Sequence, residues 1–333
     1  MASLPDAEPA LHFSDLDAPG FTRVRRGSGF HYRDAAGRPV RCRETIARLN
    51  SVALPPAYRD AWYCADPDGH IQAVGIDARG RRQYRYHPAF RARQELSKFE
   101  ACVAFGEALP RVRRAVAQAL ETRGLDPARV IAAVVRLLDL GRIRVGNERY
   151  ARDNRTHGAT TLRGRHAAVK GARVRLRFRG KHGIEREVVL SDRALASTVR
   201  RCQELPGQHL FACETGDGVR AVTSADVNAW LQGVAGAGVT AKAFRTWWAS
   251  TLALAAGQRG AGLREALDMV AAELGNTPAM ARKSYVHPAV VGWLREGAPA
   301  LRRQRATRWM SADERTLLAF LSKPVNGTLS EPV

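Results

Sequence analysis

The sequence lacks the cysteine pattern of disulfide-stabilised or zinc-binding proteins. Its five cysteines lie far apart, with no Cys-x-x-Cys pair and no histidine at ligand spacing, at positions 42, 64, 102, 202 and 213. This pattern indicates a reducing compartment. The chain also has no run of 18 apolar residues, and its first residues show neither the basic nor the apolar region of a signal peptide. We therefore expect a soluble, cytoplasmic protein that does not bind a membrane.

Motifs for nucleotide and metal chemistry are missing as well. The sequence contains no Walker A loop, no HExxH helix and no cluster of carboxylates. Any phosphate chemistry by this chain would therefore have to proceed without a metal ion and without a nucleotide. We expect no cofactor.

Acidic residues are few compared with basic ones. Lys and Arg total 53 against 32 Asp and Glu, which gives a net charge of +21 and an isoelectric point near 10.9. Such an excess predicts a polyanionic partner, first a phosphate backbone and second an anionic membrane. A coding bias would explain the preference for Arg over Lys but not the net excess. The chain would then be associated with the nucleoid.

The residue pattern changes along the 333 residues, which suffice for two domains. Residues 1–18 are acidic and aperiodic and predict a loose leader. Residues 19–90 alternate short strand patterns with Gly-containing turns, which is typical of a small β-rich domain. Residues 91–100 predict a linker or the start of a helical domain. We predict a mainly helical domain over 101–310 and a short helix and tail over 311–333.

Helical periodicity dominates the second domain. We predict a helix after the Asp126-Pro127 cap and further helices at 107–123, 191–204, 224–235, 240–256, 262–273, 278–284 and 288–296. One β-hairpin interrupts them, because residues 174–179 alternate strictly, residues 180–183 form a turn, and residues 184–190 return. The predicted fold class is α+β.

Six residues of the helical half suit the cleavage of a phosphodiester by a protein hydroxyl. The transition state places charge on two non-bridging oxygens, which need fixed donors, and the leaving oxygen needs a proton. A tyrosine nucleophile, with an ordinary pKa of about 10, also needs cationic surroundings. Suitable groups follow in order: Arg144 in RIRVG, Lys181 in RGKHG, Lys242 and Arg245 in KAFRTWW, Asn276 in LGNTP and Tyr285 in ARKSY.

In this order and spacing the segments resemble the type IB DNA topoisomerases, in particular the compact poxvirus-like group found in bacteria. That family carries an Arg, a hairpin Lys, a KxxR pair, an LGxTP-type box and a Tyr. The Tyr stands nine residues after the polar residue of the box, the spacing of Asn276 and Tyr285. RVGNERYARDNRTHGATTLR and LPPAYRDAWYCADPDGHIQAVGIDARGRRQYRYHP fit as well, so the resemblance extends over about residues 20–296.

The resemblance implies a fold of the tyrosine recombinase and type IB topoisomerase kind. Its small β-rich N-terminal domain and its larger, mainly helical catalytic domain would form a clamp around DNA. It also implies an isomerase that acts as a monomer on double-stranded DNA. Such an enzyme nicks one strand through a 3′-phosphotyrosyl link and rejoins it without ATP or a metal ion.

Roles for single residues follow from the resemblance. Tyr285 would be the nucleophile, and Arg144 and Arg245 would bind the non-bridging oxygens. Lys181 would be the general acid for the leaving 5′-oxygen, with Lys242 supporting phosphate binding or proton delivery. Asn276 stands where the viral pattern has His. Its amide can donate a hydrogen bond to a non-bridging oxygen, but it cannot carry a proton.

Further residues are candidates for contacts with DNA. Tyr84 and Tyr86 share one face of a predicted strand, and together with the nearby Gln83 they would meet base edges. The alternative is a hairpin whose aromatic side chains cover a small core. Tyr150 is placed like a family Tyr that follows the first catalytic Arg. A strictly alternating strand would present a basic face to phosphates, formed by Arg173, Arg175, Arg177 and Arg179.

Taken singly, the candidate residues have plainer interpretations. Arg144 and Lys181 would be ordinary basic residues on a solvated surface, and Tyr285 would be a core aromatic. The box at 275–278 is also a helix stop followed by a cap and a proline. The two tryptophans of KAFRTWW are typical core residues. All candidates together, in order, favour catalysis.

Two rival functions remain open on the sequence. A tyrosine recombinase shares the arrangement, but such enzymes usually carry HxxR where this chain has KAFR, and a helical domain comes first. A DNA-binding protein without catalytic activity would account for the net charge alone. Relaxation of a plasmid without a site requirement would separate the enzyme from both.

Overall fold

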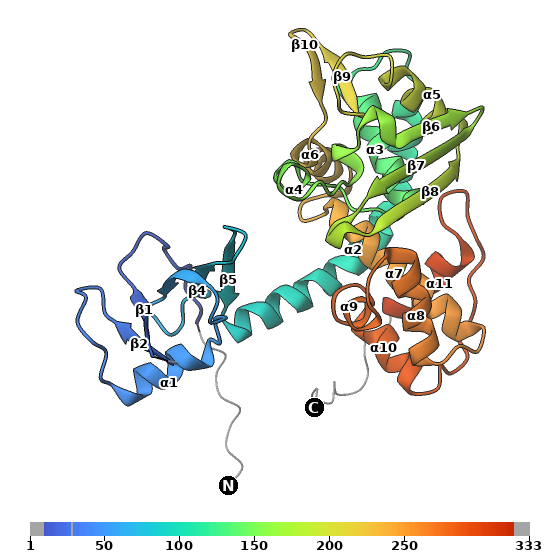
Figure 1. Ribbon diagram of the computed structural model, residues 1–333. Coiled ribbons are helices and arrows are strands. Elements are labelled where there is room, and N and C mark those ends of the chain that lie inside the picture. Colours follow the sequence, from blue (N-terminus) through green and yellow to red (C-terminus); the bar gives the residue numbers. More distant parts are fainter. Residues whose placement is uncertain (1–9, 28, 323–333) are drawn as a thin grey trace. The chain divides into compact units, whose positions relative to one another are not determined.

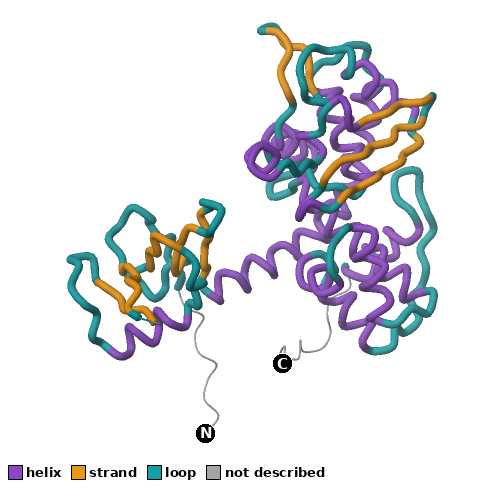
Figure 2. The backbone as a smooth tube through the Cα atoms, in the orientation of Figure 1, coloured by secondary structure: helices purple, strands orange, loops and turns teal. Residues whose placement is uncertain are grey.

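The computed structural model describes residues 10–27 and 29–322, and it divides into two compact units, Met1–Ser97 and Lys98–Val333. Strands dominate the first unit and helices the second (Figure 1, Figure 2). This agrees with the predicted α+β class. In the described part of the chain, no helix combines the length and the apolar character needed to cross a membrane.

The N-terminal unit is built around an antiparallel sheet with the strand order β2-β1-β3-β4-β5. The predicted turns that begin with Asp and end with Gly three residues later join β3 to β4 (residues 66–69) and β4 to β5 (residues 77–80). At the turn between the last two strands, the Asp77 carboxylate accepts hydrogen bonds from the backbone of Arg79 and Arg81. The elements are β1 (Phe21–Arg26), β2 (Gly29–Arg33), α1 (Arg43–Ser51), β3 (Arg59–Tyr63), β4 (Ile71–Ile76) and β5 (Arg82–Tyr86).

The core of this unit is small, and it forms between the sheet and α1, a helix that we did not predict. Leu49 on α1 packs against Tyr32, Tyr63 and Ala73 of the sheet. The rings of Tyr32 and Tyr63 meet edge to face at 5.4 Å, and the Tyr32 hydroxyl donates to Asn50 Oδ1. Among the described residues, none of those that form this core belongs to β5, so the exposed face of β5 described below is not part of it.

The segment before the sheet corrects the expected loose leader. Its first residues, 1–9, lie outside the described part. From His12 onward the chain is bound, because His12 pairs with Gly69 and Ser14 Oγ donates to the Ile71 carbonyl. Trp62 Nε1 donates to the Ala18 carbonyl. An aperiodic segment can thus be held by hydrogen bonds to distant strands, which no local sequence pattern records.

Residues 91–100, which we predicted to be a linker or the start of a helical domain, lie within helix α2 (Pro88–Leu120). The helix predicted for 107–123 is only its second half and ends at Leu120. Pro88 is the first residue of the helix, where a proline fits because no intrahelical donor is lost. The preceding His87 Nδ1 accepts from Ala89 N. What we interpreted as linker composition is therefore a helix start, and the boundary of the two units falls inside α2.

The first part of the second unit joins helices to two small sheets. Asp126 caps α3 as predicted, since its carboxylate accepts from Arg129 N. The predicted hairpin is β7 and β8, and a third strand, β6, extends it; a second hairpin, β9 and β10, was not predicted. The elements are α3 (Pro127–Gly141), α4 (Glu148–Asn154), β6 (Ala167–Lys170), β7 (Arg173–Arg179), β8 (Glu185–Ser191), α5 (Arg193–Cys202), β9 (Ala212–Thr215) and β10 (Gly218–Ala221).

The remaining helices begin and end within a few residues of their predicted positions. They are α6 (Ser224–Ala235), α7 (Ala241–Gln258), α8 (Leu263–Leu274), α9 (Pro278–Ser284), α10 (Pro288–Arg295) and α11 (Ala312–Leu321). Thr277, Pro278 and the left-handed Gly275 form the predicted stop and cap between α8 and α9. These short connections carry much of the site described next.

Helix α7 lies in the core and is fixed there by a buried ionic network. Trp247 is fully buried, as expected of a core residue, and its Nε1 donates to Glu314 on α11. Arg113 on α2 pairs with both Glu314 and Asp139, at 2.7 and 2.8 Å. Removing one member of a buried pair leaves an uncompensated charge at a cost of about 3–5 kcal/mol. The network therefore joins α2, α3 and α11 to α7.

Candidate active site

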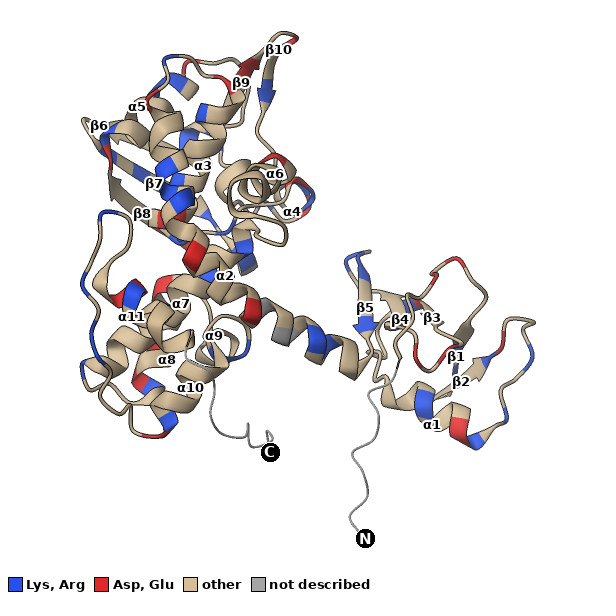
Figure 3. Ribbon diagram, turned by 180° about the vertical axis from the view of Figure 1, so that it is seen from behind, with Lys and Arg blue, Asp and Glu red and all other residues tan. Residues whose placement is uncertain are grey.

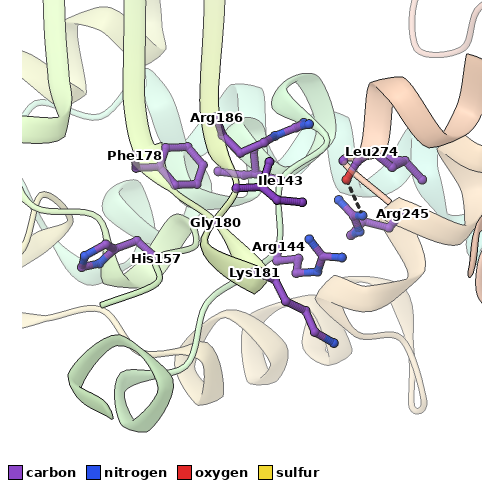
Figure 4. Close-up of a pocket in the computed structure, with 11 residues that line it drawn as sticks. Ile143, Arg144, His157, Phe178, Gly180, Lys181, Arg186, Arg245 and Leu274 are labelled. Atoms are coloured by element: carbon purple, nitrogen blue, oxygen red, sulfur yellow. Dashed lines mark hydrogen bonds between the residues drawn. The ribbon is translucent and has the colours of Figure 1, made fainter. Parts of the chain in front are cut away.

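The second unit, Lys98–Val333, is the one that we expect to be the catalytic unit. A pocket in it gathers four cationic side chains from separate elements (Figure 4). Arg144 follows α3, Lys181 lies in the turn after β7, Arg186 lies on β8, and Arg245 lies on α7. None of the described residues that line the pocket is acidic. Such a site attracts an anion, because the positive charges have no carboxylate among them to compensate them.

Arg144 lies in an extended segment that starts where α3 ends at the left-handed residue Arg142 (φ 54°). The Arg144 carbonyl accepts from Ala159 N at 2.8 Å. Gly158 allows this close approach, since a Cβ there would lie 2.5 Å from the same carbonyl oxygen. Arg144 Nη2 donates to Asn276 Oδ1 at 2.8 Å. Hydrogen bonds thus hold both the backbone and the guanidinium group of Arg144.

Arg245 is buried, with 4% of its surface exposed. Its Nη1 and Nη2 donate to the carbonyls of Arg142 and Leu274, at 2.6 and 3.0 Å. These bonds fix the guanidinium group 4.8 Å from the centre of the Tyr285 ring. Burial and the nearby charge of Arg144 lower the pKa of Arg245 to about 10. The group therefore stays charged at neutral pH.

Two buried donors beside the pocket have no acceptor. Asn276 uses its Oδ1 for Arg144, and its buried Nδ2 has no hydrogen-bond partner; nor does Nε of Arg245. A buried donor without a partner costs about 1–3 kcal/mol. Such groups are rare, and a missing anion is one explanation for them. A phosphate bound in this pocket would supply the acceptors.

Tyr285 is the residue that ends α9, and its backbone N donates to the Ala281 carbonyl at 3.0 Å. Its ring is half-buried. Burial of the phenol raises its pKa, but the charges of Arg245 and Arg144 outweigh this and lower the pKa of Tyr285 below its ordinary value. The cationic surroundings that a tyrosine nucleophile needs are therefore present.

The two candidate lysines are placed differently. Lys181 is exposed in the turn between β7 and β8, and it lines the pocket. The start of this turn is fixed, since His157 N donates to the Arg179 carbonyl at 2.7 Å. Lys242 is exposed on the first turn of α7 and does not line the pocket. The structure thus brings Lys181 to the pocket and leaves Lys242 outside its lining. Asn276 and Tyr285 do not line the pocket either, but they contact Arg144 and Arg245, which do.

Two residues of the pocket, Arg186 and His157, were missed in the sequence. Arg186 Nη2 donates to the Glu273 carbonyl at 2.8 Å, and burial together with the charge of Arg144 lowers its pKa. The signal was the period of two along β8, where Arg186 and the buried Val188 share the inward face. His157 had no comparable signal, because it lies in an irregular segment.

On the N-terminal unit, Tyr84 and Tyr86 lie on one exposed face of β5, with 39% and 41% of their surface accessible. Their rings stack at 6.2 Å. Gln83, which we expected to meet base edges together with them, does not share this face. Gln83 lies on the opposite face, as the period of two requires, and its Nε2 donates to the Asp77 carboxylate at 2.9 Å.

The basic strand β7 is exposed as its alternation predicts, and Figure 3 shows its basic residues. However, β8 places acidic residues beside them. Glu187 pairs with both Arg175 and Arg177, at 2.7 and 2.8 Å, and Glu185 pairs with Arg179 at 3.3 Å. Exposed ion pairs contribute only about 0–1 kcal/mol, so a phosphate can compete for these arginines.

Tyr150 lies on α4 with 55% of its surface exposed. Its backbone N donates to the capping side chain of Asn147 at 3.2 Å. The position leaves the ring accessible to a large ligand. Trp248, the second tryptophan after Arg245, is instead packed, since its Nε1 donates to the Asp139 carbonyl.

Comparison with known proteins assigns the chain to a family. The family model described as "Eukaryotic DNA topoisomerase I, catalytic core" matches residues 87–307, and "Bacterial DNA topoisomerase IB, N-terminal domain" matches residues 29–77. DNA topoisomerase 1B of Acanthamoeba polyphaga mimivirus is 28% identical over 285 residues, which cover 80% of this chain and 85% of that protein.

Among solved structures, the XerH site-specific recombinase bound to its palindromic difH substrate is similar at 16% identity. The TM-score is 0.37, over 54% of this chain and 47% of that chain. A likeness at this level carries no argument about function. The catalytic-core match covers more than half of the sequence, and the N-terminal match extends it. The chain belongs to the type IB DNA topoisomerases, and its substrate is DNA.

Proposed function

We propose that this topoisomerase relaxes supercoiled duplex DNA through a covalent 3′-phosphotyrosyl link at Tyr285. The observation that carries the assignment is the phenol of Tyr285 beside two guanidinium groups that lower its pKa. The phenol loses its proton to the surrounding water, the phenolate oxygen attacks the scissile phosphorus, and the bond from phosphorus to the 5′-oxygen breaks. The products are the tyrosyl phosphodiester and a free 5′-hydroxyl.

The charge that develops in this step falls on the two non-bridging oxygens. Arg144 and Arg245 are the cationic donors for them, and Arg245 is already fixed by two carbonyls. Asn276 Nδ2 supplies a neutral donor. Donors that are in place before the reaction need no reorganisation, which makes them effective in lowering the barrier.

The leaving 5′-oxygen needs a proton, and Lys181 is the proposed donor. It lines the pocket from a turn, while Arg144, Arg245 and Asn276 are held by hydrogen bonds to their neighbours. A flexible ammonium group can follow the leaving oxygen. Lys242 lies outside the pocket, so its proposed role is limited to binding phosphates of the flanking DNA.

Religation is the reverse of cleavage. The 5′-hydroxyl attacks the tyrosyl phosphodiester, returns a proton to Lys181, and releases Tyr285. One phosphodiester is exchanged for another at each step, so no ATP is needed. Between the steps, rotation of the free 5′ strand relaxes supercoils of either sign.

The DNA partner is proposed to be double-stranded and the enzyme to act as a monomer at the nucleoid. In this proposal Tyr84 and Tyr86, which are exposed on β5, meet base edges, and Tyr150 and the arginines of β7 meet the backbone. Gln83 is engaged with Asp77, so it would contact a base only after that bond is broken.

The test is to mix the protein with negatively supercoiled plasmid in EDTA without ATP. We expect relaxed topoisomers and, after denaturation with SDS, protein attached to the 3′ end of a nick. Tyr285→Phe keeps the ring and should bind the plasmid with unchanged affinity but give neither product. A wild-type protein that relaxes nothing, or a Tyr285→Phe variant that still forms the adduct, contradicts the proposal.

A further inference from the structure

The N-terminal unit contains a cavity that this chemistry does not use. Its volume is about 270 Å³, and its lining includes Phe13, His70, Phe90, Arg93, Gln94 and Ser97. These residues come from the segment before the sheet, the start of β4 and the first turns of α2. For comparison, an apolar cavity of about 150 Å³ already accepts a benzene ring. The cavity therefore has room for a flat heterocycle.

Aromatic rings run without a break from β5 to this cavity. Tyr84 stacks on Tyr86, and Tyr86 stacks on Phe90 at 5.6 Å with an angle of 23° between the planes. Phe90 meets the His70 ring at 5.0 Å, and His70 meets Phe13 at 4.8 Å. Five rings thus form a continuous series, from the exposed strand face to the cavity.

Phe13 is 86% exposed, although it lines the cavity. A single exposed apolar residue needs no explanation. Here, however, the segment that carries the ring is held in place, since His12 pairs with Gly69 and Ser14 N donates to His70 Nδ1 at 2.8 Å. The ring is therefore presented at the cavity with one face available for stacking.

The polar groups of the lining match a nucleobase and its phosphate. Gln94 offers an amide for the donors and acceptors at a base edge. Ser97 Oγ donates to the Gln94 carbonyl at 3.4 Å and offers an acceptor. Arg93 brings a positive charge near a flanking phosphate. Because His70 Nδ1 accepts a hydrogen bond, the proton of a neutral ring is on Nε2, which is a further donor. An aliphatic ligand would use none of these groups.

We propose that this cavity binds one unpaired nucleobase of DNA, stacked against Phe13. The inference rests on DNA being the substrate and adds a binding site for a base that has left the double helix. Sequence-independent binding of unpaired bases commonly combines aromatic faces with a positive charge, as found here. The base has two sources: a position extruded from a duplex, or a single-stranded end.

The experiment measures the affinity of the full-length chain, in the Tyr285→Phe form, for three duplexes of equal sequence. One is fully paired, one has a single extruded 5-iodouracil, and one has a short overhang that carries it. The same samples are irradiated and the crosslinked peptide is identified by mass spectrometry. Phe13→Leu removes the aromatic face but keeps the apolar bulk, and Phe13→Trp keeps the face.

We expect tighter binding of an unpaired substrate than of the paired one, by about fivefold or more. Phe13→Leu should abolish this preference and Phe13→Trp should retain it, while the crosslink maps to residues of the cavity. The two unpaired substrates identify the source of the base. Equal affinity for all three duplexes, or a preference that Phe13→Leu leaves intact, overturns the proposal.

This outcome is distinguishable from failure of the proposed reaction. Plasmid relaxation is measured separately with Tyr285 intact, and Phe13→Leu should still relax the plasmid because Phe13 is not part of the catalytic pocket. Loss of the preference for unpaired bases, with relaxation retained, supports the cavity as a separate site. A preference for unpaired bases in a chain that forms no covalent adduct would support the cavity and contradict the reaction.

Discussion

The two units differ in charge and in the kind of side chain that they expose. The N-terminal unit has 15 Lys and Arg against 11 Asp and Glu, whereas the catalytic unit has 38 against 21. In the described part of the chain, Phe13, Tyr84 and Tyr86 are strongly exposed on the first unit, and Tyr150 on the second. Most of the net charge thus belongs to the unit that contains the cationic pocket.

This difference suggests a division of tasks. Phosphates carry charge but no sequence, and bases offer flat faces and hydrogen-bonding edges. A chain that separates its charges from its exposed aromatics can therefore bind the backbone with one unit and test the bases with the other. Variants of the catalytic unit should change the reaction, and variants of the aromatic series should change which DNA is chosen.

The largest effect in this comparison is expected for Lys181→Ala. Loss of a general acid lowers the rate about 10²- to 10⁴-fold. Single-turnover cleavage of a suicide duplex measures this, with an ordinary and a 5′-thio leaving group. The thio substrate needs no proton donor, so it should be cleaved at nearly the wild-type rate. Equal slowing of both substrates would contradict the assignment of Lys181. Lys242→Ala serves as a control from outside the pocket.

A smaller effect, visible in the pH profile, is expected for Arg144→Gln. The charge of Arg144 lowers the pKa of Tyr285, and burial raises it. In the wild type, cleavage should rise with pH and level off above a pKa that lies below 10. Without Arg144 that pKa moves up, so the profile should shift to higher pH and cleavage at neutral pH should fall about 10²-fold or more.

Arg186→Gln is the matched control for this shift. It removes a cation from the same pocket, but one that is not among the principal influences on the pKa of Tyr285. Its profile should keep the wild-type midpoint, even if the rate falls. If both variants shift the profile equally, the pocket acts through its total charge and the specific role of Arg144 is wrong.

The smallest effects are expected for DNA affinity, when one exposed residue of either unit is replaced. Arg177→Ala should weaken binding of all duplexes alike and reduce the slope of log K against log salt concentration by about 1. Tyr86→Ala should weaken binding about tenfold and leave that slope unchanged, because stacking releases no counterions. The measurement is a salt titration of affinity with each variant. A lower slope for Tyr86→Ala would contradict the assignment of base contacts to the N-terminal unit and backbone contacts to the catalytic unit.

The sequence predicted the parts of the site that are local in the chain. The spacing from Asn276 to Tyr285 follows from one helix stop, one cap and one short helix. The relative position of these two residues therefore depends only on consecutive residues of the chain. Caps such as Asp126 and strict alternation, as in β7, are equally local. Since side-chain hydrogen bonds and alternation act over a few residues, such features can be predicted from the sequence.

Features that depend on distant partners were missed. Glu187 neutralises arginines of β7 only because register places it opposite Arg177. The bound state of residues 12–18 depends on residues that lie 44 to 57 positions away in the chain. The error on Gln83 was different, since the period of two already places it opposite Tyr84. There, a short distance in sequence was mistaken for a shared face.

The ionic network around Arg113 has a consequence for the synthesis of the enzyme. Helix α7, which carries Arg245, is translated well before α11, which supplies Glu314 to Trp247 and Arg113. Until α11 has left the ribosome, Trp247 lacks the acceptor Glu314, and Arg113 pairs with Asp139 alone. A chain that already contains Tyr285 but not α11 is thus expected to hold Arg245 less firmly than the finished enzyme does.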